Sequence, residues 1–581
     1  MPHDWAQLKA KRASKSTGTP RARVTSPPPS SKNLLPEPSA PVEEVTAKEV
    51  SSKRLEYDHR DLPPSLSVHS IPNRGRGIIV NEAVIRGSTL LSTTPLVSVL
   101  DNRNLSQRCS ACCRSSEDIA SRKPLQQCSL CHIVQYCSSA CQHQDWSLHK
   151  FECKAMRQMS VIAKEQGHAT GKGKGKGPYV PDTPVRAIAR LLWRSEVEGE
   201  SFWKHIESLE SHRDKLSHEE QERFFHLSMA ISTYVGQATV VKSCPNSAAL
   251  IDLLSRFTSN SFSLTSPTDL TNIGVSISPL TALFNHSCTP NAVVVFPSFP
   301  SPASPLNSIL KNMRVIAIRT IEEGEEVLTS YVDLGLTRKK RRDELRERYK
   351  FECRCEACGQ EVGTDSREAF ECPREGCDGL VGIFGGGGES TCSVCREIVE
   401  VPEIDAALKA AEEAYEEAEK TQYSDPAAAQ INLSNLISSL TSFSPRLSPT
   451  SYPLHQAYTL LLTLQLHSQD FSSASATAQL AWRGATKLYS YGHPVRCILS
   501  TTIARLASTP PSTTSPEEDL RYWSNLKDRS LGVRMMVEAL RECEVGFGKG
   551  GGEVGKKLRE LVRDQEEGIE MARKLLRETQ A

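Results

Sequence analysis

The sequence lacks long uninterrupted apolar runs and lacks an excess of charge of either sign. No stretch approaches the roughly 18 consecutive apolar residues of a membrane-spanning helix, and the first 55 residues contain no apolar segment typical of a secretory signal. The 70 Lys and Arg residues balance 69 Asp and Glu residues, leaving a net charge of +1. We therefore expect a soluble, unsecreted protein with no membrane partner and no global attraction to nucleic acid.

Aromatic residues are nearly absent from the first 55 positions, which are rich in Pro, Ser, Lys and Arg. Such a segment cannot bury enough apolar area to fold, so we predict a disordered tail. Its basic residues, between Lys9 and Arg23, fit either a nuclear address or a merely solvated tail, and we expect the nucleus, the cytoplasm or both. The Gly-Lys repeat 171–177 lacks the preceding strand and the Gly-Lys-Ser/Thr ending of a phosphate loop, so it predicts a flexible linker.

The 581 residues exceed what one hydrophobic core usually supports, and the apolar patterns change along the chain. Short apolar runs separated by Gly, Asn and Pro predict strands within 66–100 and again within 273–332. Helical periodicity predicts helices across 183–257 and a C-terminal series at 404–420, 427–440, 454–466 and 554–579. The fold class expected is therefore multidomain α+β, ending in helices that resemble tetratricopeptide pairs without a fixed 34-residue period.

Cysteine is abundant, with 19 residues, and without a secretory signal clustered Cys pairs favour metal over disulfides. Thiolate and imidazole ligands in groups of four suit tetrahedral zinc. The first block supplies eight ligands for two zinc ions, against the alternative of buried unliganded thiols: Cys109, Cys112, Cys128, Cys131, Cys137, Cys141, His149 and Cys153.

Two further cysteine groups follow. Cys353, Cys355 and Cys358 offer three thiolates and need a fourth ligand from elsewhere in the chain. A last set has zinc-ribbon spacing, with ordinary loop cysteines as the alternative: Cys372, Cys377, Cys392 and Cys395. Four cysteines remain and are most simply buried small hydrophobic residues: Cys113, Cys244, Cys497 and Cys543.

Several motifs resemble those of a known family. Residues 136–142, with Trp146, His149 and Cys153, resemble the MYND zinc finger. The segment 285–291, Asn-His-Ser-Cys-Thr-Pro-Asn, resembles the Asn-His-Ser-Cys motif of SET domains, and 322–333 resembles their Gly-Glu-Glu-x-x-x-x-Tyr segment. In this order, over roughly 66–360, the motifs resemble the SET and MYND domain family of protein-lysine methyltransferases.

The resemblance implies a ligand pairing and a domain order. One finger zinc would take Cys109, Cys112, Cys137 and Cys141, and the other Cys128, Cys131, His149 and Cys153, while Cys288 would complete the post-SET zinc. The ribbon would hold a fourth ion. The implied parts are a tail (1–55), the N-terminal SET part (56–108), the MYND finger (109–153), a helical insert with its linker (154–258), the SET core (259–335), the post-SET segment (336–360), a zinc ribbon (361–400) and C-terminal tetratricopeptide-like helices (401–581).

The resemblance also implies an active site that uses S-adenosylmethionine. Tyr331 falls on the catalytic tyrosine of the family, either as a base or as a positioning group, and Asn285 and His286 would hold the amino group and adenine of the cofactor. The residues implied to bind the cofactor are Arg74, Gly75, Arg76, Asn260, Asn285, His286, Tyr331, Tyr349 and Phe351. Taken singly, these positions also fit an ordinary turn, a satisfied polar core group or aromatic core packing.

The function expected is protein-lysine N-methylation of a histone or non-histone substrate by a monomeric enzyme. The alternative is an adaptor with an inactive SET domain, whose MYND finger recruits proline-rich partners in transcription. Direct DNA binding is a weaker reading, because the finger helix carries His143, Asp145 and Glu152 and no row of arginines suited to bases or phosphates.

Overall fold

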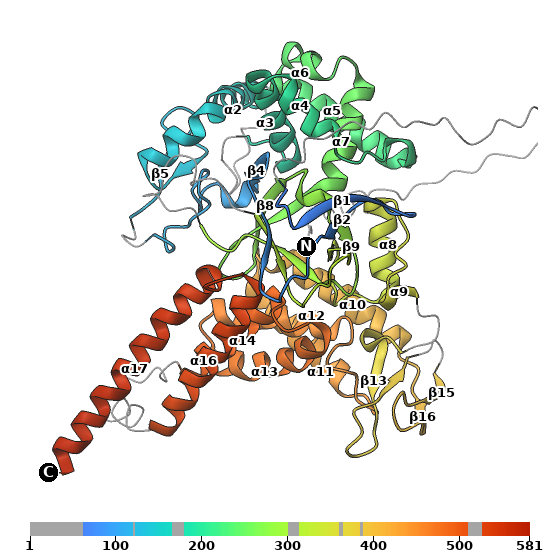
Figure 1. The fold of residues 1–581 in the computed structure, drawn as a ribbon, viewed down its shortest axis with the longest axis vertical. Coiled ribbons are helices and arrows are strands. Elements are labelled where there is room, and N and C mark those ends of the chain that lie inside the picture. The colour runs from blue at the N-terminus through green and yellow to red at the C-terminus, as the bar shows by residue number, and fades with distance from the viewer. Residues whose placement is uncertain are drawn as a thin grey trace, which may run out of the picture. The chain divides into compact units, whose positions relative to one another are not determined.

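The computed structural model describes residues 62–119, 123–165, 179–299, 313–359, 364–383, 387–508 and 526–580. The predicted tail and the Gly-Lys linker lie outside these residues. The described part contains short β-sheets and many helices in alternation (Figure 1), so the expectation of a mixed α and β fold with a helical C-terminal region is confirmed. Among its helices, none is long and apolar enough to cross a membrane.

The first strands form a hairpin of β1 (Leu66–Ile71) and β2 (Gly75–Val80), in which Leu66 lies opposite Val80. Its turn contains Asn73 and Gly75, both with positive φ angles of 61° and 73°. A left-handed conformation is accessible to Asn and favoured by Gly, which explains the position of the turn. The side chains of Ile78 and Val80 are fully buried.

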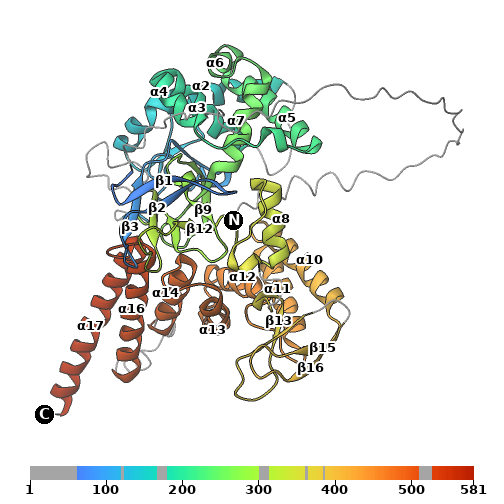
Figure 2. The same cartoon turned by 45° about the vertical axis from the view of Figure 1, so that its right-hand side comes forward.

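Two three-stranded sheets and one parallel pair accompany this hairpin. The first sheet has the order β10 (Ala292–Val295), β11 (Met313–Ala317), β3 (Thr89–Thr93), and the second β4 (Val97–Leu100), β8 (Asn272–Ile277), β7 (Ser261–Thr265). The pair joins β9 (Asn285–His286) to β12 (Leu328–Thr329) in parallel (Figure 2). Strands from both ends of the predicted domain therefore meet in one core.

Helices interrupt this core. They are α2 (Ser139–Glu165), α3 (Thr183–Glu198), α4 (Glu200–Glu207), α5 (His218–Val235), α6 (Gln237–Ser243) and α7 (Ser247–Asn260). The start of α5 has a capping box, in which Ser217 and Glu220 satisfy each other's backbone N–H groups. Seven residues of α3 in succession, 187–193, are at most 5% exposed, so this helix is buried on all sides.

The finger strands are β5 (Gln126–Gln127) and β6 (Gln135–Tyr136), and the post-SET helices are α8 (Arg338–Tyr349) and α9 (Glu356–Gly359). Two small hairpins follow, made of β13 (Ala369–Glu371) with β14 (Leu380–Gly382) and β15 (Gly388–Thr391) with β16 (Ile398–Val401). Among the described residues, short 3-10 helices lie at η3 (Asn102–Asn104), η4 (Arg213–Lys215), η5 (Thr281–Leu283) and η7 (Ser366–Glu368).

The C-terminal series consists of α10 (Asp405–Thr421), α11 (Pro426–Thr441), α12 (Leu454–His467), α13 (Phe471–Leu488), α14 (Pro494–Ser508), α16 (Leu526–Gly546) and α17 (Gly552–Gln580). The four helices predicted from periodicity are present with ends within two residues. This series packs on the first sheet, because Val295 and Ile316 share a buried apolar cluster with Phe547 and Leu558.

Candidate functional site

The structure brings the sulfur and imidazole ligands of each predicted metal set together. In each of the four groups the potential ligand atoms all lie within 4.8 Å of one another. Neighbouring sulfur atoms are 3.4 Å apart for Cys137 and Cys141 and 3.9 Å apart for Cys128 and Cys153. A tetrahedron with 2.3 Å zinc–sulfur bonds has edges of about 3.8 Å, whereas a disulfide spans roughly 2.05 Å. These four groups could each hold a zinc ion.

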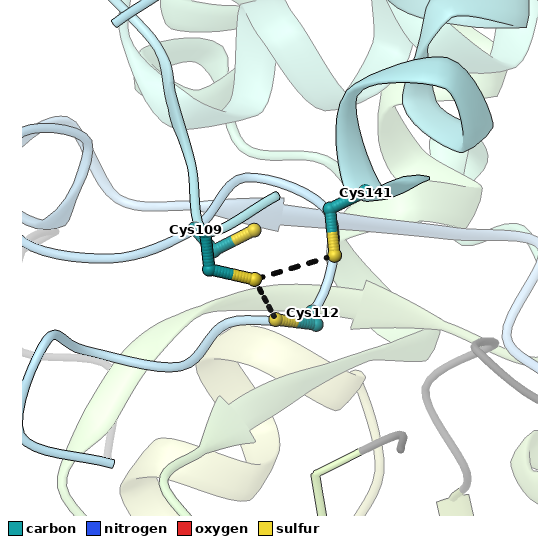
Figure 3. Close-up of side chains that lie close together, drawn as sticks. Cys109, Cys112 and Cys141 are labelled. Atoms are coloured by element: carbon teal, nitrogen blue, oxygen red, sulfur yellow. Dashed lines mark hydrogen bonds between the residues drawn. The ribbon is translucent and has the colours of Figure 1, made fainter. Parts of the chain in front are cut away.

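The first finger site lies where β6 runs into α2. Figure 3 shows the side chains of Cys109, Cys112 and Cys141 pointing toward one another. Cys137 lies 3.6 Å from Cys112, sulfur to sulfur, and completes the set. The spare thiol, Cys113, is buried but is not a member of the group.

The second finger site is fully buried and contains the one imidazole ligand of the four groups. His149 Nε2 lies 3.7 Å from the sulfur of Cys131, and both belong to the group with Cys128 and Cys153. Beside it, Glu152 has no exposed surface. Burial alone would raise the pKa of this carboxyl, but Arg190 and Arg186 hold that pKa well below its usual range.

The third site joins Cys288 to three cysteines of the segment 353–358. Cys288, two residues after β9, lies 3.5 Å from Cys358, sulfur to sulfur, and their group includes Cys353 and Cys355. The fourth site lies between the two small hairpins, where Cys377 and Cys395 are half-buried. There a Cβ on Gly379 would lie 2.2 Å from the sulfur of Cys392, so only glycine fits beside this group.

The parallel pair of β9 and β12 positions the residues predicted for methyl transfer. Tyr331 follows β12, and its backbone N–H donates to Nδ1 of His286 at 3.0 Å. The Tyr331 hydroxyl donates to the carbonyl oxygen of Phe284 at 2.7 Å. Burial raises the pKa of Tyr331 and lowers that of His286 to about 4, so both side chains are neutral at physiological pH.

Aromatic rings surround Tyr331. Its ring centroid lies 4.9 Å from that of Tyr349, 5.3 Å from that of His286 and 6.4 Å from that of Phe351. The Tyr349 hydroxyl also donates to the Tyr331 carbonyl oxygen at 3.4 Å. This arrangement forms an apolar wall at the residue predicted to be catalytic.

Asn285 belongs to a polar cluster with Glu326, Arg74 and Arg76. The Asn285 amide donates to Glu326 Oε1 at 2.8 Å and to the Arg76 carbonyl oxygen at 3.1 Å, which leaves Oδ1 as an acceptor. Arg74 pairs with the same carboxylate, and 38% of the Arg74 side chain is exposed. A Cβ on Gly77 would lie 2.7 Å from Glu326 Oε1 and 2.8 Å from Asn285 Nδ2, so this close approach requires glycine.

Two predicted cofactor contacts lie toward a different segment. The Arg76 guanidinium donates to the carbonyl oxygen of Ser208, just after α4. Asn260, at the end of α7, donates both amide hydrogens to the carbonyl oxygens of Glu210 and Arg256. Both side chains thus hold the loop at 208–210 in place.

Three further residues complete this site, although none was among the residues implied to bind the cofactor: Gly77, Asn291 and Glu326. Glu326 lies in the segment 322–333, and Gly77 ends a Gly-Arg-Gly segment that resembles the Gly-x-Gly of SET domains; both lie against Asn285. Asn291 is fully buried, and its Oδ1 accepts from the Leu328 N–H at 2.7 Å, which fixes β12 beside β9. In the sequence, the only indication of these three residues is that they lie in the same motifs as the residues implied to bind the cofactor.

Comparisons with known proteins agree with this geometry. The SET domain model matches residues 75–332. The chain is 30% identical over 300 residues to N-lysine methyltransferase SMYD2 of Gallus gallus, covering 51% of this chain and 60% of that protein. It is 25% identical over 331 residues to histone-lysine N-methyltransferase ASHR1 of Arabidopsis thaliana (54% and 61%) and 28% over 290 residues to histone-lysine N-methyltransferase SMYD3 of Mus musculus (49% and 59%).

The matched region thus spans about 60% of the length of these relatives. It includes β2, β9 and β12, the strands that carry Gly75, Asn285 and the approach to Tyr331. The chain thus contains a SET domain and four cysteine clusters, and these, with the similarity to lysine methyltransferases, support the SET and MYND domain family that its motifs predicted.

Proposed function

We propose that this protein is an S-adenosylmethionine-dependent protein-lysine N-methyltransferase acting on a histone or non-histone protein. The observation that carries the proposal is the contact between His286 and Tyr331, which joins the polar cluster to the aromatic wall. The cofactor would bind at the polar cluster, and the substrate lysine would lie against the aromatic wall.

The residues present fit the cofactor. Arg74 offers a partly exposed cation, Asn285 Oδ1 offers an acceptor for an amino group, and a Cβ on Gly75 would meet nothing within 4 Å, so the backbone there borders open space. Arg74, Gly75, Arg76, Asn285 and His286 would hold S-adenosylmethionine, with Asn260, Tyr349 and Phe351 around it. When bound, the cofactor supplies an electrophilic methyl group.

The chain's own residues would prepare the lysine. A free lysine amine has a pKa of about 10.4, and a poorly hydrated aromatic site lowers it by disfavouring the ammonium. The rings of Tyr331, Tyr349 and Phe351 would exclude water, and the Tyr331 hydroxyl, held by the Phe284 carbonyl, would guide the amine. Positioning of this kind accounts for much of the rate in a displacement reaction.

The metal groups would be structural zinc sites, since each has four protein ligands and no open position. Two belong to the proposed finger (109–153), one joins 259–335 to 336–360, and one belongs to the ribbon (361–400). The finger is the surface we assign to proline-rich peptides, the C-terminal helices (401–581) would select the substrate, and the proposed enzyme is a monomer of the nucleus, the cytoplasm or both.

Transfer of a tritiated methyl group to proteins of a lysate tests the proposal. Wild type is expected to label lysine, and Tyr331→Phe to lose most of the label while keeping its fold and zinc content. Tyr423→Phe makes the same chemical change at a side chain that is 64% exposed and is expected to label normally. Labelling that is absent from wild type, or equal in Tyr331→Phe, would discard the proposed reaction and favour the adaptor.

A further inference from the structure

Glu152, itself fully buried, lies at the centre of a charge network between the finger and the helical insert. Its carboxylate accepts from Arg186 Nε at 3.0 Å and from Arg190 Nε at 2.9 Å. Arg190 also donates to both oxygens of Asp145, at 2.8 and 3.3 Å, and Tyr136 donates to Asp145 at 2.9 Å. Two carboxylates and two guanidiniums therefore balance in a largely buried site.

The same carboxylate faces a metal-ligand histidine. Glu152 Oε2 lies 3.8 Å from Nδ1 of His149, one turn earlier on α2, and both side chains are fully buried. Nδ1 has no hydrogen-bond partner among the described residues, whereas Nε2 faces the sulfur of Cys131. An imidazole that binds a metal through one nitrogen generally directs the other toward a carboxylate or carbonyl, which fixes its tautomer and orientation.

The network continues into the SET core. Arg186 donates through Nη1 to the carbonyl oxygen of Leu100, the last residue of β4, at 2.8 Å, and to Asn102 Oδ1 at 3.2 Å. Arg186 and Arg190 are one turn apart on the buried helix α3. A continuous path of contacts therefore runs from the histidine of the metal group to a strand of the core.

We propose that Glu152 is a positioning residue for the His149 metal site, and that through Arg186 and Arg190 it couples metal occupancy of this site to the docking of α3 on the SET core. The inference rests on the proposed zinc site. It makes the finger an integral part of the SET fold, since loss of this one ion would loosen a helix buried in the insert.

Chelator competition on the zinc-loaded full chain tests the first half. Glu152→Gln is expected to lower the zinc affinity of one of the four sites by roughly 10- to 100-fold and to leave the affinity of the other three unchanged. Glu352→Gln is the matched control, because Glu352 also directly precedes a metal-ligand cysteine but its side chain is 40% exposed and pairs with Arg342 and Arg346. If folded Glu152→Gln binds all four zinc ions with unchanged affinity, the positioning role is overturned.

A double-mutant cycle separates positioning from general support. His149→Cys turns the site into four thiolates, which have no second ring nitrogen to orient. Glu152→Gln is expected to lower the zinc affinity of this site when His149 is present and to have no effect on it in the His149→Cys variant. An equal loss in both backgrounds would show that the carboxylate only supports the fold. If Glu152→Gln alone does not fold, Glu152→Gln/Arg190→Gln keeps the buried charges balanced and carries the same measurements.

Hydrogen exchange tests the coupling. Cys128→Ser removes one ligand of this site only and is expected to speed amide exchange across α3 by tenfold or more, on the order of the loss of a buried contact. Cys392→Ser removes one ligand of the ribbon site and is expected to leave the amide exchange of α3 unchanged. Unchanged α3 exchange in Cys128→Ser would refute the coupling, and a wild-type chain that holds no ion at His149 would instead refute the zinc site itself.

Discussion

Nδ1 of His286 accepts a hydrogen bond from the backbone N–H of Tyr331 at 3.0 Å. A backbone N–H only donates, so this nitrogen carries no proton, and the ring proton is on Nε2. Nε2 lies 3.3 Å from the sulfur of Cys288. One neutral imidazole therefore connects the proposed catalytic tyrosine to a ligand of the post-SET metal group.

Replacing Cys288 with serine is expected to affect both ends of this connection. The post-SET group loses one of its four thiolates, so zinc per chain should fall from four ions to three, as measured by elemental analysis. Because the His286 ring loses its sulfur acceptor, S-adenosylmethionine affinity should fall as well. Cys244→Ser, at a buried thiol outside the four groups, is expected to keep four ions and full affinity.

Gly77→Ala is expected to separate Asn285 from Glu326. The new Cβ would lie within 2.8 Å of both side chains, and crowding of this kind costs about 1–3 kcal/mol of unfolding free energy. Gly324→Ala is the control, since its φ of 79° costs about 1–2 kcal/mol but its Cβ would meet nothing within 4 Å. Thermal unfolding should shift in both variants, and only Gly77→Ala should lose cofactor affinity; equal affinities would contradict the role of this cluster.

Phe547→Ala is expected to loosen the C-terminal helices from the SET core. The side chain is 1% exposed and shares a cluster with Val295 and Ile316, so its loss should cost about 3–5 kcal/mol. Limited proteolysis should then cleave both the SET core and the C-terminal helices sooner than in wild type. Phe471→Ala, at a side chain 43% exposed, should change stability by less than about 1 kcal/mol.

Acid is expected to destabilise the protein through His455. Burial lowers the pKa of this histidine from 6.5 to about 4, with Asp333 as its charged neighbour. The unfolded state therefore binds the proton first, so stability is full above pH 6.5 and is lost as pH falls toward 4, by roughly 2 kcal/mol at pH 5. Unfolding measured between pH 7.5 and 4.5 should show a shallower loss for His455→Asn, while His226→Asn, at an exposed ring, should follow wild type.

The metal groups were predictable from sequence because their chemistry is local. Pairs such as Cys128 and Cys131, three positions apart, can reach one ion from a single turn, and few other functions need that spacing. The fourth ligand of the post-SET group was different. Cys288 lies 65 or more residues before its partners, and only the resemblance to SET motifs connected them.

The buried polar contacts were not predictable from the same patterns. Glu152 lies on a helix that the finger resemblance implied and Arg190 on one that periodicity predicted, but neither pattern orients its helix. Nothing in the sequence signals a contact between residues 38 positions apart. Gly77 likewise reads as part of an ordinary turn until β2 packs against Asn285. Such contacts depend on the tertiary register of whole elements, which apolar periodicity leaves open.

The central claim is that the polar cluster around Asn285 binds S-adenosylmethionine. Calorimetry on the zinc-loaded protein tests it most directly, with Asn285→Ala as the variant. We expect one cofactor per chain for wild type and an affinity reduced roughly tenfold or more for Asn285→Ala, since a hydrogen bond to a charged amino group is lost. No binding by folded wild type, or equal binding by Asn285→Ala, would contradict the account.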